Sequence, residues 1–159
     1  MLSEPVLRPP SRGDLPALQR LLLELGYDVD STQLGRRVEL LAAHSDHFLR
    51  VAVDADGEVL GAVHAFLLFD LTAGAATEIA VLVVGSRTRR GGVGRALVHA
   101  VEGWSAQRGV YRVQVRSQIH REAAHAFYRE LGYIPVKQQT VLVREPKELR
   151  PRGPTTIVD

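Results

Sequence analysis

A short loop rich in glycine and arginine constrains the fold of this chain more than any other segment. It reads Arg89-Arg90-Gly91-Gly92-Val93-Gly94-Arg95 and follows an apolar stretch, 77–84, that is typical of a strand. The residues after it have apolar side chains at helical spacing: Val93, Leu97, Ala100, Val101 and Trp104. The sequence therefore predicts a strand, a glycine loop and a helix in immediate succession.

This succession favours a loop that binds phosphate. A helix N-terminus offers unpaired backbone N–H groups and the positive end of the helix dipole, and glycines let a ligand approach the backbone closely. Arg89, Arg90 and Arg95 can add charge-assisted hydrogen bonds. A glycine pair alone would equally suit a solvated turn with surface arginines. The strand, loop, arginines and helix together favour binding.

Two other phosphate motifs do not fit this loop. A Walker loop needs Lys and then Ser or Thr after its last glycine, whereas Arg95 and Ala96 follow Gly94. A dinucleotide fingerprint needs a small residue at the position of Leu97 and an acid near the position of Arg116. The loop therefore predicts a small phosphorylated ligand of another kind.

The remaining periodicity predicts an α+β fold in one domain, 1–145, followed by a polar, proline-containing tail, 146–159. With 159 residues the chain is long enough for one core and too short for two ordinary domains. The predicted helices cover about 15–25, a stretch from 31 or 32, 93 to about 108, and 122–131. The predicted strands cover 48–53, 59–68, 77–84, 112–116 and 140–144.

Composition excludes several classes of protein. The chain has no cysteine, so it has neither disulfides nor an acyl-cysteine intermediate, and its six histidines show no metal-ligand spacing. With a net charge of +2 and 6% aromatic residues it does not resemble a nucleic-acid binder. No apolar run reaches the length of a membrane span. We expect a soluble, cytoplasmic protein with no metal.

The glycine loop and a second motif resemble the GCN5-related N-acetyltransferases. That family's coenzyme A signature is Gln or Arg, two residues, Gly, one residue, then Gly or Ala, which matches Arg89, Gly92 and Gly94. The second motif is Phe127-Tyr128 followed by Leu131-Gly132-Tyr133. The chain departs from the pattern at Arg90, where glycine is most frequent in the family, and at Arg121, where many members have an asparagine that contacts coenzyme A.

The resemblance implies a mixed, mostly antiparallel sheet that is splayed between its fourth and fifth strands, with helices on both faces. Acetyl-coenzyme A would lie in that opening, bonded to strand-four backbone groups, one of which could face the thioester carbonyl as an oxyanion donor. The residues that the resemblance assigns to the cofactor are Leu82, Val83, Val84, Arg89, Arg90, Gly91, Gly92, Val93, Gly94, Arg95, Arg121, Ala124 and Phe127.

Two residues are implied in the chemistry, each with a structural alternative. Tyr128 stands where many members place a tyrosine that protonates the departing thiolate, although helical spacing also permits a core aromatic. Glu78 aligns with the general-base glutamate of the family's histone acetyltransferases. It could instead be a strand-edge carboxylate that is paired with a nearby arginine.

The resemblance thus implies an N-acetyltransferase that moves an acetyl group directly to a primary amine of a small molecule or a protein, through a ternary complex. The alternative is a non-catalytic acyl-coenzyme A sensor or regulatory module. The expected partners are acetyl-coenzyme A and an amine acceptor whose identity the sequence leaves open. A homodimer also remains open.

Overall fold

The computed structural model describes residues 3–117 and 120–145. Its elements, in chain order, are β1 (Val6–Arg8), the 3₁₀ helix η1 (Arg12–Asp14), α1 (Leu15–Glu24), α2 (Ser31–Ala43), β2 (His47–Val53), β3 (Val59–Asp70), β4 (Gly74–Val84), α3 (Val93–Gln107), β5 (Val113–Val115) and α4 (Glu122–Glu130). The strands form one sheet in the order β1-β2-β3-β4-β5. All neighbours are antiparallel except β4 and β5, which are parallel. The predicted α+β fold is confirmed.

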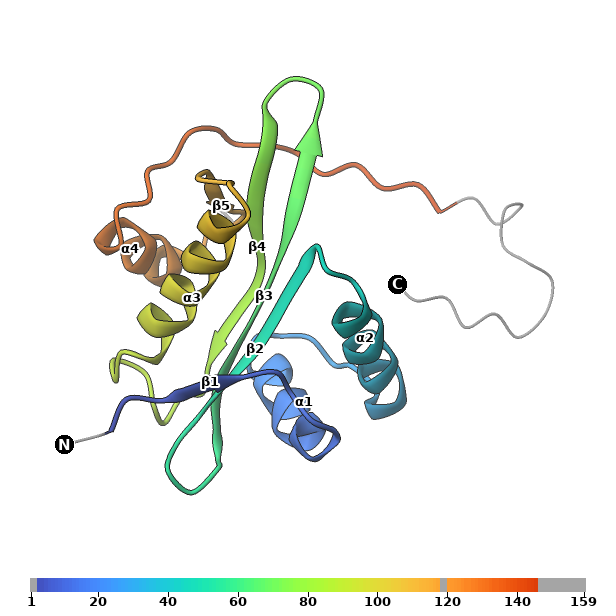
Figure 1. Ribbon diagram of the computed structural model, residues 1–159, viewed down its shortest axis with the longest axis vertical. Coiled ribbons are helices and arrows are strands. Elements are labelled where there is room, and N and C mark those ends of the chain that lie inside the picture. Colours follow the sequence, from blue (N-terminus) through green and yellow to red (C-terminus); the bar gives the residue numbers. More distant parts are fainter. Residues whose placement is uncertain (1–2, 118–119, 146–159) are drawn as a thin grey trace.

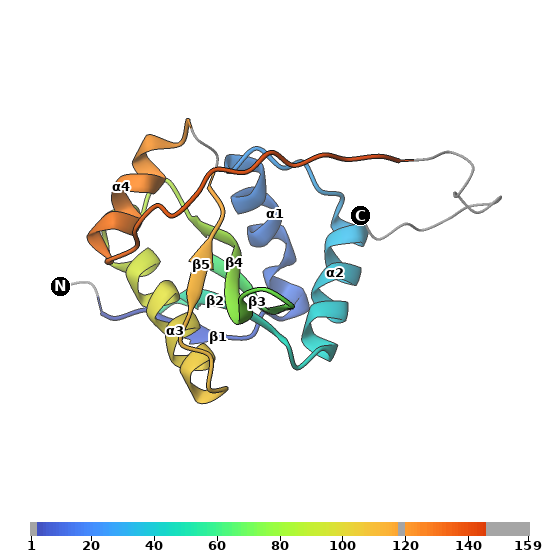
Figure 2. The same cartoon turned by 90° about the horizontal axis from the view of Figure 1, so that it is seen from above.

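Helices cover both faces of the sheet, as expected. Figures 1 and 2 show α3 and α4 on one face and α1 and α2 on the other. Because successive side chains of a strand point to opposite faces, the strands contribute side chains to two separate hydrophobic cores. The core beneath α3 and α4 includes Phe48, Ile79 and Leu97, and the core beneath α1 and α2 includes Leu18, Leu34 and Val83.

The sheet opens between β4 and β5. Their register joins Thr77–Ile79 to Val113–Val115 and extends no further, whereas β4 continues to Val84. Where this pairing ends, β4 also has a β-bulge: His64 pairs with Val81 and Ala65 with Ile79, so Ala80 has no partner on β3. An extra residue bends and twists a strand, and such bulges are common beside active sites. The splayed sheet is therefore present.

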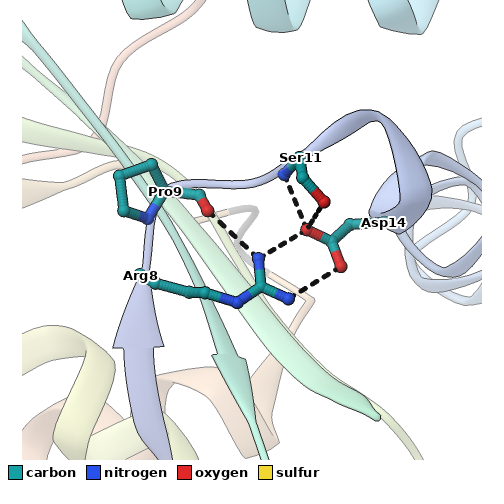
Figure 3. A network of polar contacts seen from close by, with 4 residues as sticks. All are labelled: Arg8, Pro9, Ser11 and Asp14. Atoms are coloured by element: carbon teal, nitrogen blue, oxygen red, sulfur yellow. Dashed lines mark hydrogen bonds and ion pairs between the residues drawn. The ribbon is translucent and has the colours of Figure 1, made fainter. Parts of the chain in front are cut away.

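A charged network fixes the start of the chain to the first helix. The guanidinium of Arg8 at the end of β1 donates to both carboxylate oxygens of Asp14, at 2.6 and 3.0 Å, and the Ser11 N–H donates to the same carboxylate at 2.7 Å (Figure 3). Arg8 also donates to the carbonyl of Pro9. The hydrogen bonds from Arg8 lower the pKa of Asp14 to about 2. Sequence reasoning did not predict β1, because three residues carry too little periodicity.

The predicted strand at 140–144 is wrong: these residues have no regular secondary structure. A strand is defined by its ladder partner, and these residues have none among the described strands. The tail predicted for 146–159 lies outside the described residues. None of the described helices has the length and apolar character to span a bilayer. The described residues also contain no group of three His, Cys, Asp or Glu that could hold a metal ion.

Candidate active site

The loop between β4 and α3 has two residues in the left-handed backbone conformation. Gly92, the N-cap of α3, has φ 81°, and Arg90 has φ 69°. Arg90 is the one non-glycine residue with positive φ in the described part of the chain. For an L-residue this conformation costs about 1–2 kcal/mol. A glycine at position 90 would adopt this conformation without that cost.

The N-terminus of α3 presents unpaired donors. The first N–H groups of a helix, here those of Val93, Gly94 and Arg95, have no acceptor within the helix. No side chain caps this end of α3, and no atom lies within 4 Å of the Cβ position at Gly92. The side chains of Arg89, Arg90 and Arg95 are exposed, as is Gly91 of the same loop. This end of α3 can therefore accept an anionic group.

Contacts with β3 and with α1 fix the loop in place. The Gly85 N–H donates to the carbonyl of Leu60 at 2.8 Å, and the Ser86 N–H donates to the carboxylate of Glu24 at 3.1 Å. Arg121, the N-cap of α4, reaches the carbonyl of Leu25 at 3.4 Å. The end of α1 thus contacts both the glycine loop and the start of α4. Arg121, expected at the cofactor, bonds here to the α1 terminus.

Gly94 has a packing role that sequence reasoning missed. A Cβ at Gly94 would lie 3.2 Å from Cζ of Phe127 and 3.5 Å from Cγ2 of Val84. Phe127 on α4 therefore packs directly over the first turn of α3 and the end of β4. Ala124, one turn earlier on α4, is half-buried. The two sequence motifs meet at this contact.

The residues of β4 beyond the β5 ladder line the opening. Leu82 and Val84 pack toward α3 and α4, and Val83 packs toward α1 and α2. On its other side this part of β4 pairs with β3. Alternate backbone N–H and C=O groups of a strand point to its two sides, so those on the β5 side here have no ladder partner. They can bond an extended ligand in the way an added strand would.

Tyr128 lies in the core on the α3 and α4 face. It is 8% exposed and packs edge-on against the rings of Phe127 and Tyr133, with centroids 5.1 and 5.5 Å away. Burial raises the pKa of Tyr128 to about 12. No described residue hydrogen-bonds its hydroxyl, whereas the Tyr133 hydroxyl donates to Glu102 at 2.9 Å. Tyr128 therefore has a protonated hydroxyl that is not used in internal bonding.

Glu78 lies on the opposite face of β4. Its neighbour Thr77 bonds to Ser105 of α3 at 2.7 Å, so strand alternation turns Glu78 toward the α1 and α2 face. Glu78 is 7% exposed, and its Oε2 contacts Gln114 Nε2 at 2.8 Å and Arg116 Nε at 3.1 Å. The pairing with an arginine was one of the two alternatives from the sequence. Gln114 and Arg116 themselves were not predicted, because the parallel register of β5 is non-local.

A histidine pair shares the α1 and α2 face with Glu78. Phe66 pairs with Glu78 in the β3–β4 register, and His64 is two residues before Phe66 on the same strand. Nδ1 of His47 lies 2.9 Å from Nε2 of His64. Burial lowers the pKa of His64 to about 4, so this imidazole is neutral at pH 7. These side chains add aromatic and hydrogen-bonding groups beside the carboxylate.

The opening beside a helix N-terminus defines a protein that can hold an extended, anionic ligand between two strands of a sheet. The model of the acetyltransferase (GNAT) family matches residues 15–133. The chain belongs to this family, and it is an N-acetyltransferase.

Individual relatives agree with this assignment. The chain is 29% identical over 150 residues to an aminoglycoside N(6′)-acetyltransferase type 1 of Stenotrophomonas maltophilia, covering 92% of this chain and 96% of that protein. Its fold is similar to that of an aminoglycoside 6′-N-acetyltransferase from Acinetobacter baumannii, with a TM-score of 0.78 and 17% identity over 89% and 99% of the two chains. It is also similar to glucosamine-6-phosphate N-acetyltransferase from Arabidopsis thaliana, with a TM-score of 0.75 and 21% identity over the same shares.

Proposed function

We propose that this chain transfers an acetyl group from acetyl-coenzyme A directly to a primary amine of a small molecule. The observation that carries the proposal is the relation between Glu78 and Tyr128, which lie on opposite faces of the sheet beside the opening between β4 and β5. Attack at a thioester carbonyl brings the amine to one side and releases sulfur on another. A carboxylate and a phenol on opposite faces suit those two tasks.

The chain has groups of the right kind to hold acetyl-coenzyme A. The unpaired N–H groups at the start of α3, with Arg89, Arg90 and Arg95, would bind its phosphates. The unpaired backbone of Leu82–Val84 would bond its amide-containing arm, and Phe127 and Ala124 would line the α4 side. When bound, acetyl-coenzyme A supplies the activated acetyl group.

Proton movement would be divided between the two faces. An alkylammonium, with a reference pKa near 10.4, must lose a proton before its nitrogen can attack. Glu78 would accept that proton directly or through water. Tyr128 has a pKa of about 12, well above that of a thiol near 8.5, so it would stabilise the leaving sulfur by a hydrogen bond and not by complete proton transfer. An unpaired N–H of β4 would stabilise the carbonyl oxygen.

An aminoglycoside or a related amino sugar is the acceptor class that we propose first. The curated relative that spans 92% of this chain carries the name aminoglycoside N(6′)-acetyltransferase, which supports this choice. On the α1 and α2 face, the Glu78 carboxylate suits an ammonium group, and His64 and His47 offer hydrogen bonds for sugar hydroxyls.

The alternative function, an acyl-coenzyme A sensor, is favoured by one observation. Glu78 is bound by Gln114 and Arg116, as a purely structural carboxylate would be. A sensor would keep the donor site and lack transfer to any amine.

The release of free coenzyme A thiol from acetyl-coenzyme A tests the proposal. We expect release in the presence of an aminoglycoside with a 6′-amino group, and much less with a matched compound that has a 6′-hydroxyl. Calorimetry should show binding of acetyl-coenzyme A and no binding of NAD or ATP, and Gly92→Glu should abolish it by filling the space at the helix N-terminus. Tight binding of acetyl-coenzyme A without turnover on any pool of amines would support the sensor instead.

A further inference from the structure

The buried carboxylate of Glu78 uses only one of its two oxygens in contacts with its neighbours. Gln114 Nε2, at 2.8 Å, and Arg116 Nε, at 3.1 Å, both contact Oε2, and no described residue donates a hydrogen bond to Oε1. Every fully buried side-chain oxygen of the described residues has a hydrogen-bond partner, so Oε1 must reach the surface, although the side chain is only 9% exposed. A donor from another molecule can therefore bind Oε1.

Arg116 also uses only part of its guanidinium. Its Nε faces Glu78, and neither terminal nitrogen, Nη1 or Nη2, forms a hydrogen bond with a described residue. Because the side chain is 60% exposed, these nitrogens are open to solvent beside the carboxylate. The terminal N–H groups of an arginine form a planar fork that binds a carboxylate or a phosphate by two parallel hydrogen bonds. Arg116 therefore has an unused anion-binding group.

The ion pair of Arg8 and Asp14 has a different geometry. There the two terminal nitrogens of the guanidinium donate to the two carboxylate oxygens, at 2.6 and 3.0 Å. The side chains of Asp14 and Glu78 are buried to a similar degree, with 7% and 9% exposed. Burial of the carboxylate therefore does not explain why Arg116 turns only its Nε to Glu78. The arrangement leaves the fork of Arg116 available to a second anion.

Positive charge exceeds negative charge around this carboxylate. Strand alternation places Arg112 on the same face as Gln114 and Arg116, and the ladder reaches it, because the Thr77 N–H donates to the Arg112 carbonyl at 2.8 Å. Arg112 is exposed and forms no ion pair with a described residue. One carboxylate and two arginines suit a ligand that carries an anionic group besides its ammonium, and they oppose a purely cationic ligand.

His47 and His64, on the same face, each have one ring nitrogen to spare. Their mutual hydrogen bond joins Nδ1 of His47 to Nε2 of His64, and the other ring nitrogens have no hydrogen bond to a described residue. Burial lowers the pKa of His64 to about 4, so this ring adds no positive charge at pH 7. Neutral imidazoles bind hydroxyl groups as donors or acceptors. The face can therefore bind the uncharged part of a sugar as well as its charged groups.

We propose that Arg116 determines which acceptor is used: its fork binds a phosphate or a carboxylate of the amino sugar whose ammonium group binds Oε1 of Glu78. This role of Arg116 rests on the proposed function, acetyl transfer at this site, and narrows its acceptor class. An amino sugar with an acidic substituent is preferred over a polycationic aminoglycoside. The anionic group stays on Arg116 throughout and takes no part in making or breaking bonds.

Calorimetry in the presence of coenzyme A tests this role, because coenzyme A has no acetyl group and binding is measured without turnover. The probes are glucosamine, glucosamine 6-phosphate and muramic acid, an amino sugar with a carboxylate. We expect at least one of the two anionic sugars to bind about tenfold or more tightly than glucosamine, since hydrogen bonds between charged groups are the strong ones. Which of them binds tightly distinguishes phosphate from carboxylate.

Two substitutions of Arg116 separate its fork from its charge. Arg116→Gln should abolish the preference for the anionic sugar and leave the affinity for glucosamine nearly unchanged. Arg116→Lys keeps the charge without the fork, so it should keep only part of the preference. Arg129→Gln is the matched control, because Arg129 is an exposed arginine of α4, on the other face of the sheet, and its substitution should keep the full preference.

Three results would overturn the role of Arg116. They are a wild-type chain that binds neither anionic sugar more tightly than glucosamine, a preference that persists in Arg116→Gln, and an aminoglycoside that binds more tightly than both anionic sugars.

The thiol-release assay separates this role from the proposed function. Arg116→Gln should raise the KM for the anionic sugar by about tenfold or more and change kcat little, because the anion is bound equally in the ground state and the transition state. If no amine supports thiol release, the proposed function fails, and calorimetry still decides whether Arg116 binds the anion. If release occurs with the same KM in the wild type and in Arg116→Gln, the proposed function stands and the role of Arg116 fails.

Discussion

The ring of Phe127 occupies the space that a side chain on Gly94 would need, with Cζ 3.2 Å from the position of that Cβ. Gly94 stands in the first turn of α3, and Phe127 is on α4. The last glycine of the loop motif therefore allows α4 to pack beside the end of β4. The loop and the second motif are linked by packing, in addition to any common ligand.

Gly94→Ala should destabilise the fold by about 1–2 kcal/mol, because the added methyl group forces the Phe127 ring to move. Gly103→Ala is the control: Gly103 is also in α3 but has no atom within 4 Å of its Cβ position, so alanine there should stabilise the helix by up to about 1 kcal/mol. Urea unfolding measures both. In a Phe127→Ala background the cost of Gly94→Ala should disappear, and equal effects at both glycines would contradict the packing role.

Local features of the fold could be predicted from the sequence, because their signals lie within a few residues. The glycine loop, α3 and the β2–β3 hairpin follow from turn residues and periodicity, and the structure confirms them. The position of Glu78 within a strand could likewise be predicted from the residues next to it in the sequence. Its contacts could not, since Gln114 and Arg116 reach it only through the parallel register of β4 and β5.

The features that could not be predicted depend on partners that are distant in the chain. The bulge at Ala80 exists because β3 and β4 pair in two registers that differ by one residue. The strand predicted at 140–144 was wrong because a strand needs a ladder partner, and the composition of these residues does not tell whether one pairs with them. The role of Gly94 required knowledge of where α4 packs.

Tyr128→Phe should lower kcat by about ten- to a thousandfold and leave the affinity for acetyl-coenzyme A nearly unchanged, because a bond to the leaving sulfur strengthens only in the transition state. Steady-state kinetics and calorimetry measure the two quantities. Since burial raises the pKa of Tyr128 to about 12, its ionisation should not affect the rate between pH 6 and 9.

Tyr133→Phe is the control for this substitution. The hydroxyl of Tyr133 is bound to Glu102, so its removal should cost about 1 kcal/mol of stability and change kcat little. Full turnover by a well-folded Tyr128→Phe variant would rule out a role of that hydroxyl in catalysis.

Asp14→Asn should reduce the free energy of unfolding at pH 7 by about 1–2 kcal/mol, less than the full pKa shift implies because Arg8 is partly exposed. The folded pKa of about 2 lies below the ordinary value of 3.8, so the carboxylate stabilises the fold fully above pH 4. This contribution is lost as the pH falls from 4 to 2. Urea unfolding at pH 7, 4 and 3 should therefore show wild type and variant converging in acid, and a constant difference would contradict the assignment.

Arg90→Gly should stabilise the fold by about 0.5–1 kcal/mol. Glycine adopts φ 69° without the conformational cost that arginine has there, and its greater freedom in the unfolded chain offsets part of this gain. Arg90→Ala keeps the backbone penalty and removes the same guanidinium. If that guanidinium binds phosphate, both variants should lose affinity for acetyl-coenzyme A in calorimetry. If only the backbone matters, Arg90→Gly should bind at least as tightly as the wild type.

Glu78→Gln should lower kcat/KM by roughly a hundredfold near pH 7 if Glu78 accepts the proton of the amine, and raising the pH should recover activity as more of the amine arrives deprotonated. The ion pair with Arg116 makes a control possible. Arg116→Gln removes the charged partner and leaves Gln114 bound to the carboxylate, so it should preserve a base at this position. If Glu78 has only a structural role, Glu78→Gln and Arg116→Gln would lower the free energy of unfolding by similar amounts. Glu78→Gln would then also keep the wild-type pH–rate profile. Rates measured from pH 6 to 10, with unfolding free energies determined on the same preparations, separate the two roles.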